Sequence, residues 1–459
     1  MSDQGTDEGY ARGLKNRQIG MMAIGGAIGT GLFLGAGAAI ETSGPALIVS
    51  YAVAGAVIFL IMRALGELLM YRPVSRSFVD YAEEFVGRFA GFATGWVYWL
   101  MWVVTAMAEI TAAGIYVQYW FPAIPQWVTA AVVLGLLFLA NLISVKVFGE
   151  FEFWFSMIKV VTIVGAIVLG VVVIVFGIGP AGDNASFAHL FGDGGFLPHG
   201  AGNALLALQS VMFAYLGVEL IGLTAGEAQN PRVVLPKAIN SVMIRIGVFY
   251  VGALVVLLSL VSWTQFHGGE SPFVRAFDAV GIHGAAGIIQ FVVLTAALSS
   301  CNSGIYSTGR MLRTLAIHRA APKRFSGLSK RQVPAASITA SAVVMAFGIL
   351  INGVVPEKAF TYITSVATVG VLWTWGIIVV CQLVYRRRSD RGELPGSQFR
   401  MPGAPWTGYF ALAFLALVVV LLGFGEDTRI ALYVTPVVAV VIGVGYLLNN
   451  RSQRVKQPV

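Results

Sequence analysis

Long apolar runs separated by short polar segments occupy the chain from residue 18 to residue 450. A helix needs about 20 apolar residues to cross the hydrocarbon core of a bilayer, because each residue advances it by only ~1.5 Å. Twelve stretches without Asp, Glu, Lys or Arg reach that length, and we predict a membrane-spanning helix in each. These stretches are residues 18–40, 42–62, 89–108, 110–145, 160–182, 194–218, 246–269, 284–309, 332–356, 359–385, 401–425 and 430–450.

Glu109 alone separates the third stretch from the fourth. The sequence Phe-Pro-Ala-Ile-Pro at residues 121–125 is a better place for a chain reversal, since proline interrupts helices. We therefore predict that the third helix runs through Glu109 and ends before that turn.

The composition supports the same class of protein. Hydrophobic residues make up 57% of the 459 positions and charged residues only 11%, whereas soluble proteins carry about 25% charged residues. These values exclude a water-soluble enzyme and indicate an all-α integral membrane protein in a lipid bilayer.

The positive charges indicate how the chain is oriented. Of the 30 Lys and Arg residues, 27 fall on one side of the predicted membrane, and only Arg275, Lys358 and Arg429 fall on the other. Cytoplasmic loops carry this excess in membrane proteins. We therefore predict a multi-pass protein of the plasma (inner) membrane with both termini in the cytoplasm and a first span that is retained. The net charge of +8 then reflects topology, and no nucleic-acid partner is expected.

A glycine-rich segment, Gly-Gly-Ala-Ile-Gly-Thr-Gly at residues 25–31, interrupts the first span. Gly25 and Gly29 are spaced as in a close helix–helix contact, so dense packing is one interpretation. The other is an unwound segment whose free N–H groups bind a carboxylate near the bilayer midplane, as in transporters with broken helices.

The sixth span carries a second interruption. Its sequence Phe-Ala-Tyr-Leu-Gly-Val-Glu, residues 213–219, combines aromatic residues with Gly217 and an acidic residue. A simple helix end there is one interpretation. Because the two interruptions lie five spans apart, the alternative is an inverted repeat of spans 1–5 and 6–10.

Two ionisable residues, Glu109 and Lys159, fall within or at the edge of predicted spans. Such residues are costly in a membrane and are functional candidates by default. Glu109 could instead anchor two helices to each other, and Lys159 could extend its ammonium group to the membrane surface. A desolvated lysine that alternates between charged and neutral forms would couple transport to protons.

Span eight adds a polar patch, Ser-Ser-Cys-Asn-Ser at residues 299–303. Its side chains either join helices or line a pathway, and Ser299 and Asn302 are the candidates for the latter. The five histidines have no ligand-like spacing and no catalytic cluster is present, so we expect neither a metal site nor an enzyme. The short tails also disfavour an amino-acid sensor with a docking domain.

Several motifs resemble those of amino acid permeases in the amino acid–polyamine–organocation superfamily, within the bacterial amino acid transporter family. The resemblance is carried by IGGAIGTGLF at residues 24–33, RALGE at 63–67, GEFEFWF at 149–155, EAQNP at 227–231 and SGIYSTGRML at 303–312. These motifs extend through the whole chain. Loop segments at 186–190, 193–195, 271–274 and 427–436 are similar to a subgroup that transports D-serine, D-alanine and glycine.

The resemblance implies a LeuT-like fold with twelve transmembrane helices: two inverted repeats of five helices, with helices 1 and 6 broken, followed by helices 11 and 12. Residues 17–178 would form the first repeat, 203–385 the second, and 406–450 the last two helices. The remaining segments would be the tails at 1–16 and 451–459, an extracellular loop at 179–202 and a cytoplasmic loop at 386–405.

The resemblance also implies where an amino acid would bind. Backbone N–H groups of the first break would hold its carboxylate, and carbonyl groups of the second would accept its ammonium group. The residues concerned are Ala27, Ile28, Gly29, Thr30 and Gly31 in the first break and Phe213, Ala214, Tyr215 and Gly217 in the second. Glu109, Ser299 and Asn302 would line the pocket, and Tyr215 would occupy a gating position.

The expected function is that of a proton-coupled importer of glycine, D-alanine and D-serine, with L-alanine and D-cycloserine as further substrates. Lys159 would carry the proton in place of a sodium ion, without any other cofactor or obligate protein partner. Glu109 and Tyr215 stand where the subgroup has Asp and Phe. A permease for another amino acid, such as GABA, proline or an aromatic one, is therefore the alternative.

Overall fold

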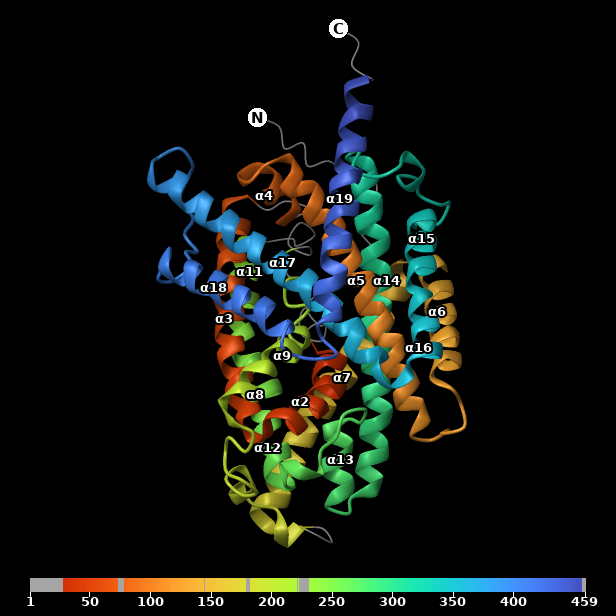
Figure 1. Cartoon of the computed structure of the whole chain (residues 1–459), viewed down its shortest axis with the longest axis vertical. Coiled ribbons are helices and arrows are strands. Elements are labelled where there is room, and N and C mark those ends of the chain that lie inside the picture. Colours follow the sequence, from red (N-terminus) through yellow and green to blue (C-terminus); the bar gives the residue numbers. More distant parts are fainter. Residues whose placement is uncertain are drawn as a thin grey trace.

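A computed structural model describes residues 28–72, 78–143, 145–178, 182–220, 222 and 231–455 (Figure 1). Within these residues every regular element is a helix and no strand occurs, as predicted. Nine helices of this part are long and apolar enough to cross a membrane. They are Gly31–Tyr71, Arg88–Gln118, Gln126–Ile143, Glu150–Phe176, Leu235–Leu260, Gly284–Ile317, Ala335–Val354, Pro356–Asp390 and Ile430–Arg451. Two shorter apolar helices are Gly200–Ala214 and Trp406–Leu422.

The individual elements subdivide these long helices. The α-helices are α2 (Ala36–Ser43), α3 (Leu47–Tyr71), α4 (Phe78–Phe85), α5 (Arg88–Gln118), α6 (Gln126–Ile143), α7 (Val145–Phe176), α8 (Gly200–Leu206), α9 (Leu208–Ala214), α11 (Pro231–Arg245), α12 (Ala253–Leu260), α13 (Pro272–Ala279), α14 (His283–Ile317), α15 (Ala335–Met345), α16 (Phe347–Val354), α17 (Pro356–Asp390), α18 (Trp406–Leu422) and α19 (Ile430–Val455). Shorter 3₁₀ or π segments are η1 (Gly31–Gly35), η2 (Gly44–Ala46), η3 (Gly182–Asn184), η4 (Phe187–Leu190), η6 (Ile246–Gly252), η7 (Trp263–Gln265) and η8 (Lys323–Phe325).

The predicted helix breaks can be compared with these bounds. Glu109 lies inside α5, and α6 begins directly after the Pro-containing turn, both as predicted. Residues 31–40 of the first predicted span and the whole of the second fall on the single run Gly31–Tyr71. Within that run α2 ends at Ser43, and Gly44 has φ of +62°, a conformation that favours glycine.

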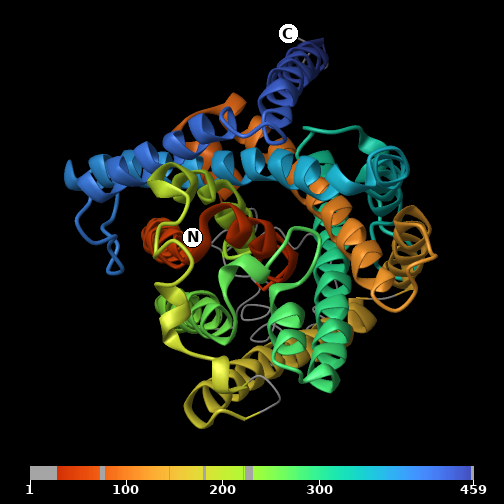
Figure 2. The same ribbon diagram turned by 60° about the horizontal axis from the view of Figure 1, so that its bottom comes forward.

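Helix α5 packs along both α14 and α17 (Figures 1 and 2). Its most apolar window is 83% buried, which explains why its sequence is hydrophobic on all sides. Glycines bring partner helices close to it: a Cβ at Gly348 or Gly370 would come within 2.8 Å of the Cβ of Met107 or Met101. Such small residues let helices associate in lipid.

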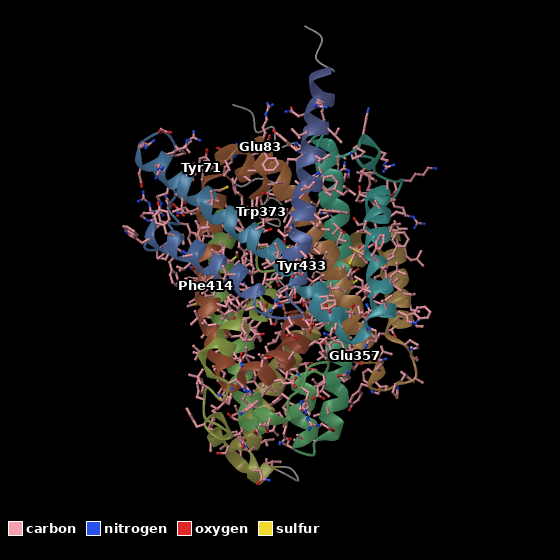
Figure 3. All side chains as sticks on the ribbon, in the orientation of Figure 1. Tyr71, Glu83, Glu357, Trp373, Phe414 and Tyr433 are labelled. Atoms are coloured by element: carbon pink, nitrogen blue, oxygen red, sulfur yellow. The ribbon has the colours of Figure 1, made fainter. Side chains whose placement is uncertain are left out.

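Helix α19 is the opposite case, since it lies at the rim of the molecule (Figure 2). Only 6% of its apolar window is buried, and Tyr433 on its surface is 69% exposed (Figure 3). Large apolar side chains on α6 and α7, such as Leu136 and Val161, are exposed in the same way. A surface of this kind is stable against lipid rather than water, so the chain forms a multi-pass membrane protein.

Candidate functional site

The helix of the sixth span stops within the predicted segment. Helix α9 ends at Ala214 and the chain continues in turns up to Glu219. Gly217 has φ of +102°, which a residue with a side chain rarely adopts. Its N–H group donates to Oε2 of Glu219 at 3.1 Å, so the acidic residue noted in the sequence stabilises the backbone where the helix stops.

The start of the described part of the first span faces this segment. Ile28 and Gly29 are not helical, and the helical run starts at Gly31. A Cβ at Gly31 would overlap the backbone of Ala214, so only glycine lets the two broken segments touch. Ala27 lies outside the described residues, as do Gly25 and Gly26.

Lys159 lies at the first break. Its side chain is completely buried, and Nζ donates to the carbonyl oxygen of Ile28 at 3.3 Å and to Oγ of Ser299 at 3.0 Å. The ammonium group therefore does not extend to the membrane surface. It links α7, α14 and the start of the first helix instead.

Glu109 approaches the same break from α5. The carboxyl group is buried beside Thr30 and Ser300, and a Cβ at Gly29 would lie 3.3 Å from Oε1. Its Oε2 and the hydroxyl of Thr30 have no hydrogen-bond partner among the described residues. Buried polar atoms are normally satisfied, so these two are suited to a polar ligand.

Glu152 is a site residue that the sequence reasoning missed. The span was predicted to begin at residue 160, which placed Glu152 outside the membrane, whereas α7 begins at Val145. Seven residues are about two helical turns, so Glu152 and Lys159 lie on the same face of α7. That spacing could have revealed the pair in the sequence.

Ser299 and Asn302, the two polar candidates of span eight, have different hydrogen-bond partners in the structure. Ser299 contacts Lys159 and donates to Oε1 of Glu152 at 2.8 Å. Asn302 accepts from Nδ2 of Asn141 at 2.8 Å and so joins α14 to α6. Asn302 thus fits the helix-joining interpretation, although its Nδ2 has no partner in the described part of the chain.

The two aromatic candidates of span six also have different surroundings. Tyr215 turns toward α3, where its hydroxyl donates to the carbonyl oxygen of Tyr51 at 2.8 Å and its ring packs against Tyr51 and Tyr250. Phe213 lies edge-on to Phe360 of α17, with ring centroids 6.3 Å apart. Phe213, and not Tyr215, lines a cavity.

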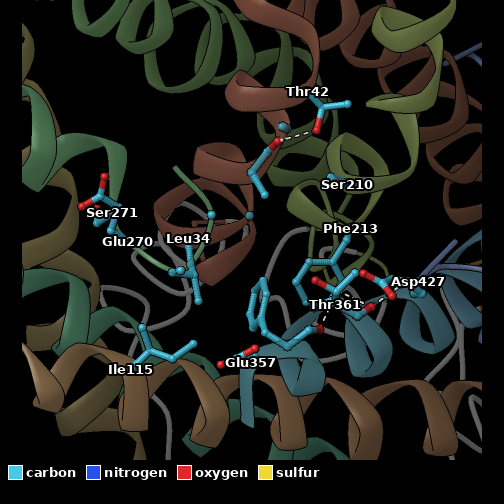
Figure 4. Close-up of a pocket in the computed structure, with 18 of the residues that line it drawn as sticks. Leu34, Thr42, Ile115, Ser210, Phe213, Glu270, Ser271, Glu357, Thr361 and Asp427 are labelled. Carbon is cyan, nitrogen blue, oxygen red and sulfur yellow. Dashed lines mark hydrogen bonds between the residues drawn. The ribbon is translucent and has the colours of Figure 1, made fainter. Parts of the chain in front are cut away.

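That cavity has a volume of about 800 Å³ and reaches Leu34, Phe213 and Thr361 (Figure 4). Leu34 follows Gly31 closely and Phe213 precedes Ala214, so one end of the cavity adjoins the two broken segments.

Carboxyl groups line the walls of the cavity: Glu270, Asp278, Glu357, Glu426 and Asp427. Partial burial raises the pKa of Glu270, while Arg275 and His267 act in the opposite direction. Lys358 pairs with Asp427 at 2.8 Å.

The described residues contain no group of three or more His, Cys, Asp or Glu side chains placed to hold a metal ion. The chemistry at these segments consists of one amine, three carboxyl groups and hydroxyl groups around unwound backbone.

The family model described as amino acid permease matches residues 18–459. The chain is 49% identical over 446 residues to the uncharacterized amino acid permease YtnA of Bacillus subtilis (strain 168), covering 96% of both proteins. It is 45% identical over 450 residues to the D-serine/D-alanine/glycine transporter of Escherichia coli (strain K12), covering 97% of this chain and 96% of that protein. It is 44% identical over 446 residues to the L-asparagine permease of the same organism, covering 96% and 89%.

Proposed function

This chain belongs to the amino acid permease family, and from that membership we propose that it imports small neutral amino acids together with protons. The proposal rests above all on one observation: a fully buried lysine binds the unwound start of the first helix. An ammonium group at that point can stabilise the broken segment when charged and release it when neutral.

The proposed architecture has twelve spans in a LeuT-like arrangement, with both termini in the cytoplasm. It is supported by the break at Gly44 within the first long run and by the contact between Gly31 and Ala214. The shorter helices α8–α9 and α18 would complete the set of spans. Because Lys358 and Asp427 belong to the side poor in positive charge, the cavity would open to the outside.

In the proposed cycle an amino acid enters the cavity and passes Phe213 to reach the two breaks. Backbone N–H groups at Ile28 to Gly31 would bind its carboxylate, and carbonyl groups near Ala214 would accept its ammonium group. The free Oε2 of Glu109 and the hydroxyl of Thr30 supply further polar contacts. Movement of the broken helices against α5, α14 and α7 would then open the opposite side.

Glycine, D-alanine and D-serine are the proposed substrates, because the Escherichia coli relative named as their transporter is 45% identical to this chain over 97% of its length. L-asparagine is a second candidate, since the relatives named as L-asparagine permeases are 44–45% identical to this chain. GABA, proline and aromatic amino acids serve as competitors that would reveal another specificity.

The decisive experiment measures uptake of labelled D-alanine into proteoliposomes, with and without an inward proton gradient. Glycine, D-serine, L-alanine, L-asparagine, GABA and L-phenylalanine are added as unlabelled competitors. Gradient-driven uptake that glycine and D-serine block is the expected result. Competition by L-asparagine alone would reassign the substrate, and uptake indifferent to the gradient would refute proton coupling.

A further inference from the structure

Glu152 lies in the interior of the bundle with only 1% of its surface exposed. Its Oε1 atom accepts hydrogen bonds from Ser299 at 2.8 Å and from Ser156 at 3.4 Å. Its Oε2 atom has no hydrogen-bond partner among the described residues. An oxygen of this kind is expensive to bury as part of a charged carboxylate, but it can carry a proton.

A continuous chain of hydrogen bonds connects Glu152 to the lysine at the first break. Nζ of Lys159 donates to Oγ of Ser299 at 3.0 Å, and the hydroxyl of Ser299 donates to Glu152 at 2.8 Å. Both distances are short enough for proton transfer through the hydroxyl group. Ser299 can accept one proton and release another without a net change in charge.

The charges around Lys159 support a mobile proton. Two carboxyl groups act electrostatically on it, Glu152 from its own helix and Glu109 from α5. The groups that face it from α14 and from the first break, Ser299 and the carbonyl of Ile28, are neutral. With all three groups ionised the cluster would hold a net negative charge, and burial disfavours that state. One additional proton on a carboxyl group restores neutrality.

We propose that Glu152 is the proton acceptor next to Lys159 and passes the coupled proton toward the cytoplasm. This inference rests on the proposed proton coupling and assigns its exit route. The ammonium group of Lys159 gives a proton to Oγ of Ser299 as the hydroxyl proton of Ser299 moves to Glu152. Lys159 becomes a neutral amine, Ser299 is unchanged, and Glu152 becomes a neutral carboxylic acid that later releases its proton to water.

The position of Glu152 along α7 fits this direction. It lies seven residues before Lys159, or about 10 Å closer to the start of the helix. The proposed orientation places the start of α7 at the cytoplasmic side, because the fifth span runs outward. A proton that leaves Lys159 through Ser299 therefore moves inward, in the direction of import.

The test compares two transport modes in proteoliposomes with labelled D-alanine. Exchange against internal unlabelled D-alanine needs no net proton movement, whereas accumulation under an inward proton gradient does. We expect Glu152→Gln to keep exchange, since the amide oxygen still accepts from Ser299, and to lose gradient-driven accumulation by about tenfold or more. Glu152→Asp keeps an ionisable group and should retain part of the accumulation.

Two serines provide a matched pair of further variants. Ser299→Ala interrupts the hydrogen-bond chain, and Ser156→Ala removes a hydroxyl from the same carboxyl oxygen without interrupting it. Both serines are fully buried. We expect Ser299→Ala to lower the ratio of accumulation to exchange and Ser156→Ala to leave it unchanged. This comparison decides the question even if Glu152→Gln does not fold.

Three results would overturn the assignment. A Glu152→Gln variant that accumulates D-alanine like the original chain shows that Lys159 releases its proton elsewhere. Equal loss of exchange and accumulation shows that Glu152 only supports the structure. If the original chain exchanges D-alanine but gains nothing from the gradient, proton coupling itself is wrong, and the role of Glu152 falls with it.

Discussion

Two buried clusters in this protein each contain an acidic and a basic residue, but they differ in how completely the charges are paired. In the first, Glu67 on α3 binds Arg386 on α17 through both carboxyl oxygens, at 2.7 and 2.6 Å. Oε2 also accepts from Nε2 of Gln382 at 3.0 Å and from the N–H group of Met401 at 2.7 Å. In the second, Glu109 and Glu152 face Lys159, and each carboxyl group has an oxygen without a described partner.

The difference separates a structural ion pair from the cluster for which we propose a role in proton transfer. A bidentate pair with all its hydrogen bonds satisfied is held in one geometry and one protonation state. It fixes α3, α17 and the segment around Met401 to one another. Around Lys159 a hydroxyl group mediates between amine and carboxylate, so that protons can be rearranged without moving a helix.

The largest effect is expected from Lys159→Ala. Without the amine, the proposed proton donor at the first break is missing, so accumulation of D-alanine under a proton gradient should fall at least about tenfold. Exchange should persist, because the backbone groups that bind the substrate are unchanged. Parallel exchange and accumulation assays in proteoliposomes measure this. Undiminished accumulation would refute a proton role for Lys159.

The next effect concerns folding and not transport coupling. Arg386→Ala would leave the charge of Glu67 buried without its partner, which costs about 3 kcal/mol. We expect a clear fall in the apparent melting temperature in detergent, with an unchanged ratio of accumulation to exchange in the protein that remains folded.

Arg388→Ala is the matched control for that variant. Arg388 lies on the same helix and pairs with Glu393 at 3.2 Å, but both side chains are more than one third exposed. Exposed pairs contribute about 0–1 kcal/mol. Equal destabilisation by the two arginine variants would contradict the view that burial makes the Glu67 pair structurally decisive.

A smaller effect is expected from Tyr215→Phe, which removes the hydroxyl that donates to Tyr51 and keeps the ring contacts. The loss should be about 1 kcal/mol in stability, with uptake of D-alanine nearly unchanged, because Phe213 rather than Tyr215 lines the cavity. Phe213→Ala is the comparison variant. If Tyr215→Phe changed uptake more than Phe213→Ala did, the gating position implied by the family resemblance would be favoured for Tyr215.

The sequence was sufficient for features that depend on local composition. The helical class followed from the apolar runs, and the break before Gly217 followed from a glycine and an acidic residue inside such a run. Lys159 stood out because charged residues are rare in apolar runs.

The surroundings of Tyr215 and Asn302 could not be predicted, because they depend on which distant helix each side chain faces. Glu152 was missed for another reason: the cost of a buried charge is offset by Lys159 and Ser299, so the helix continues where hydropathy alone ends it.

The smallest effect is expected at Glu270, a carboxyl group at the cavity that is 41% exposed on its side chain. Its pKa is raised by partial burial, so the folded protein holds this proton more tightly than the unfolded chain. The contribution to stability is then complete at low pH and is lost as the pH rises through the raised pKa. Glu270→Gln should remove that pH dependence and change stability by no more than about 0.5 kcal/mol. Melting temperatures at pH 4 to 7 measure this. A shift as large as that of Arg386→Ala would mean that the partly exposed Glu270 matters as much for stability as the buried Glu67 pair, which contradicts this prediction.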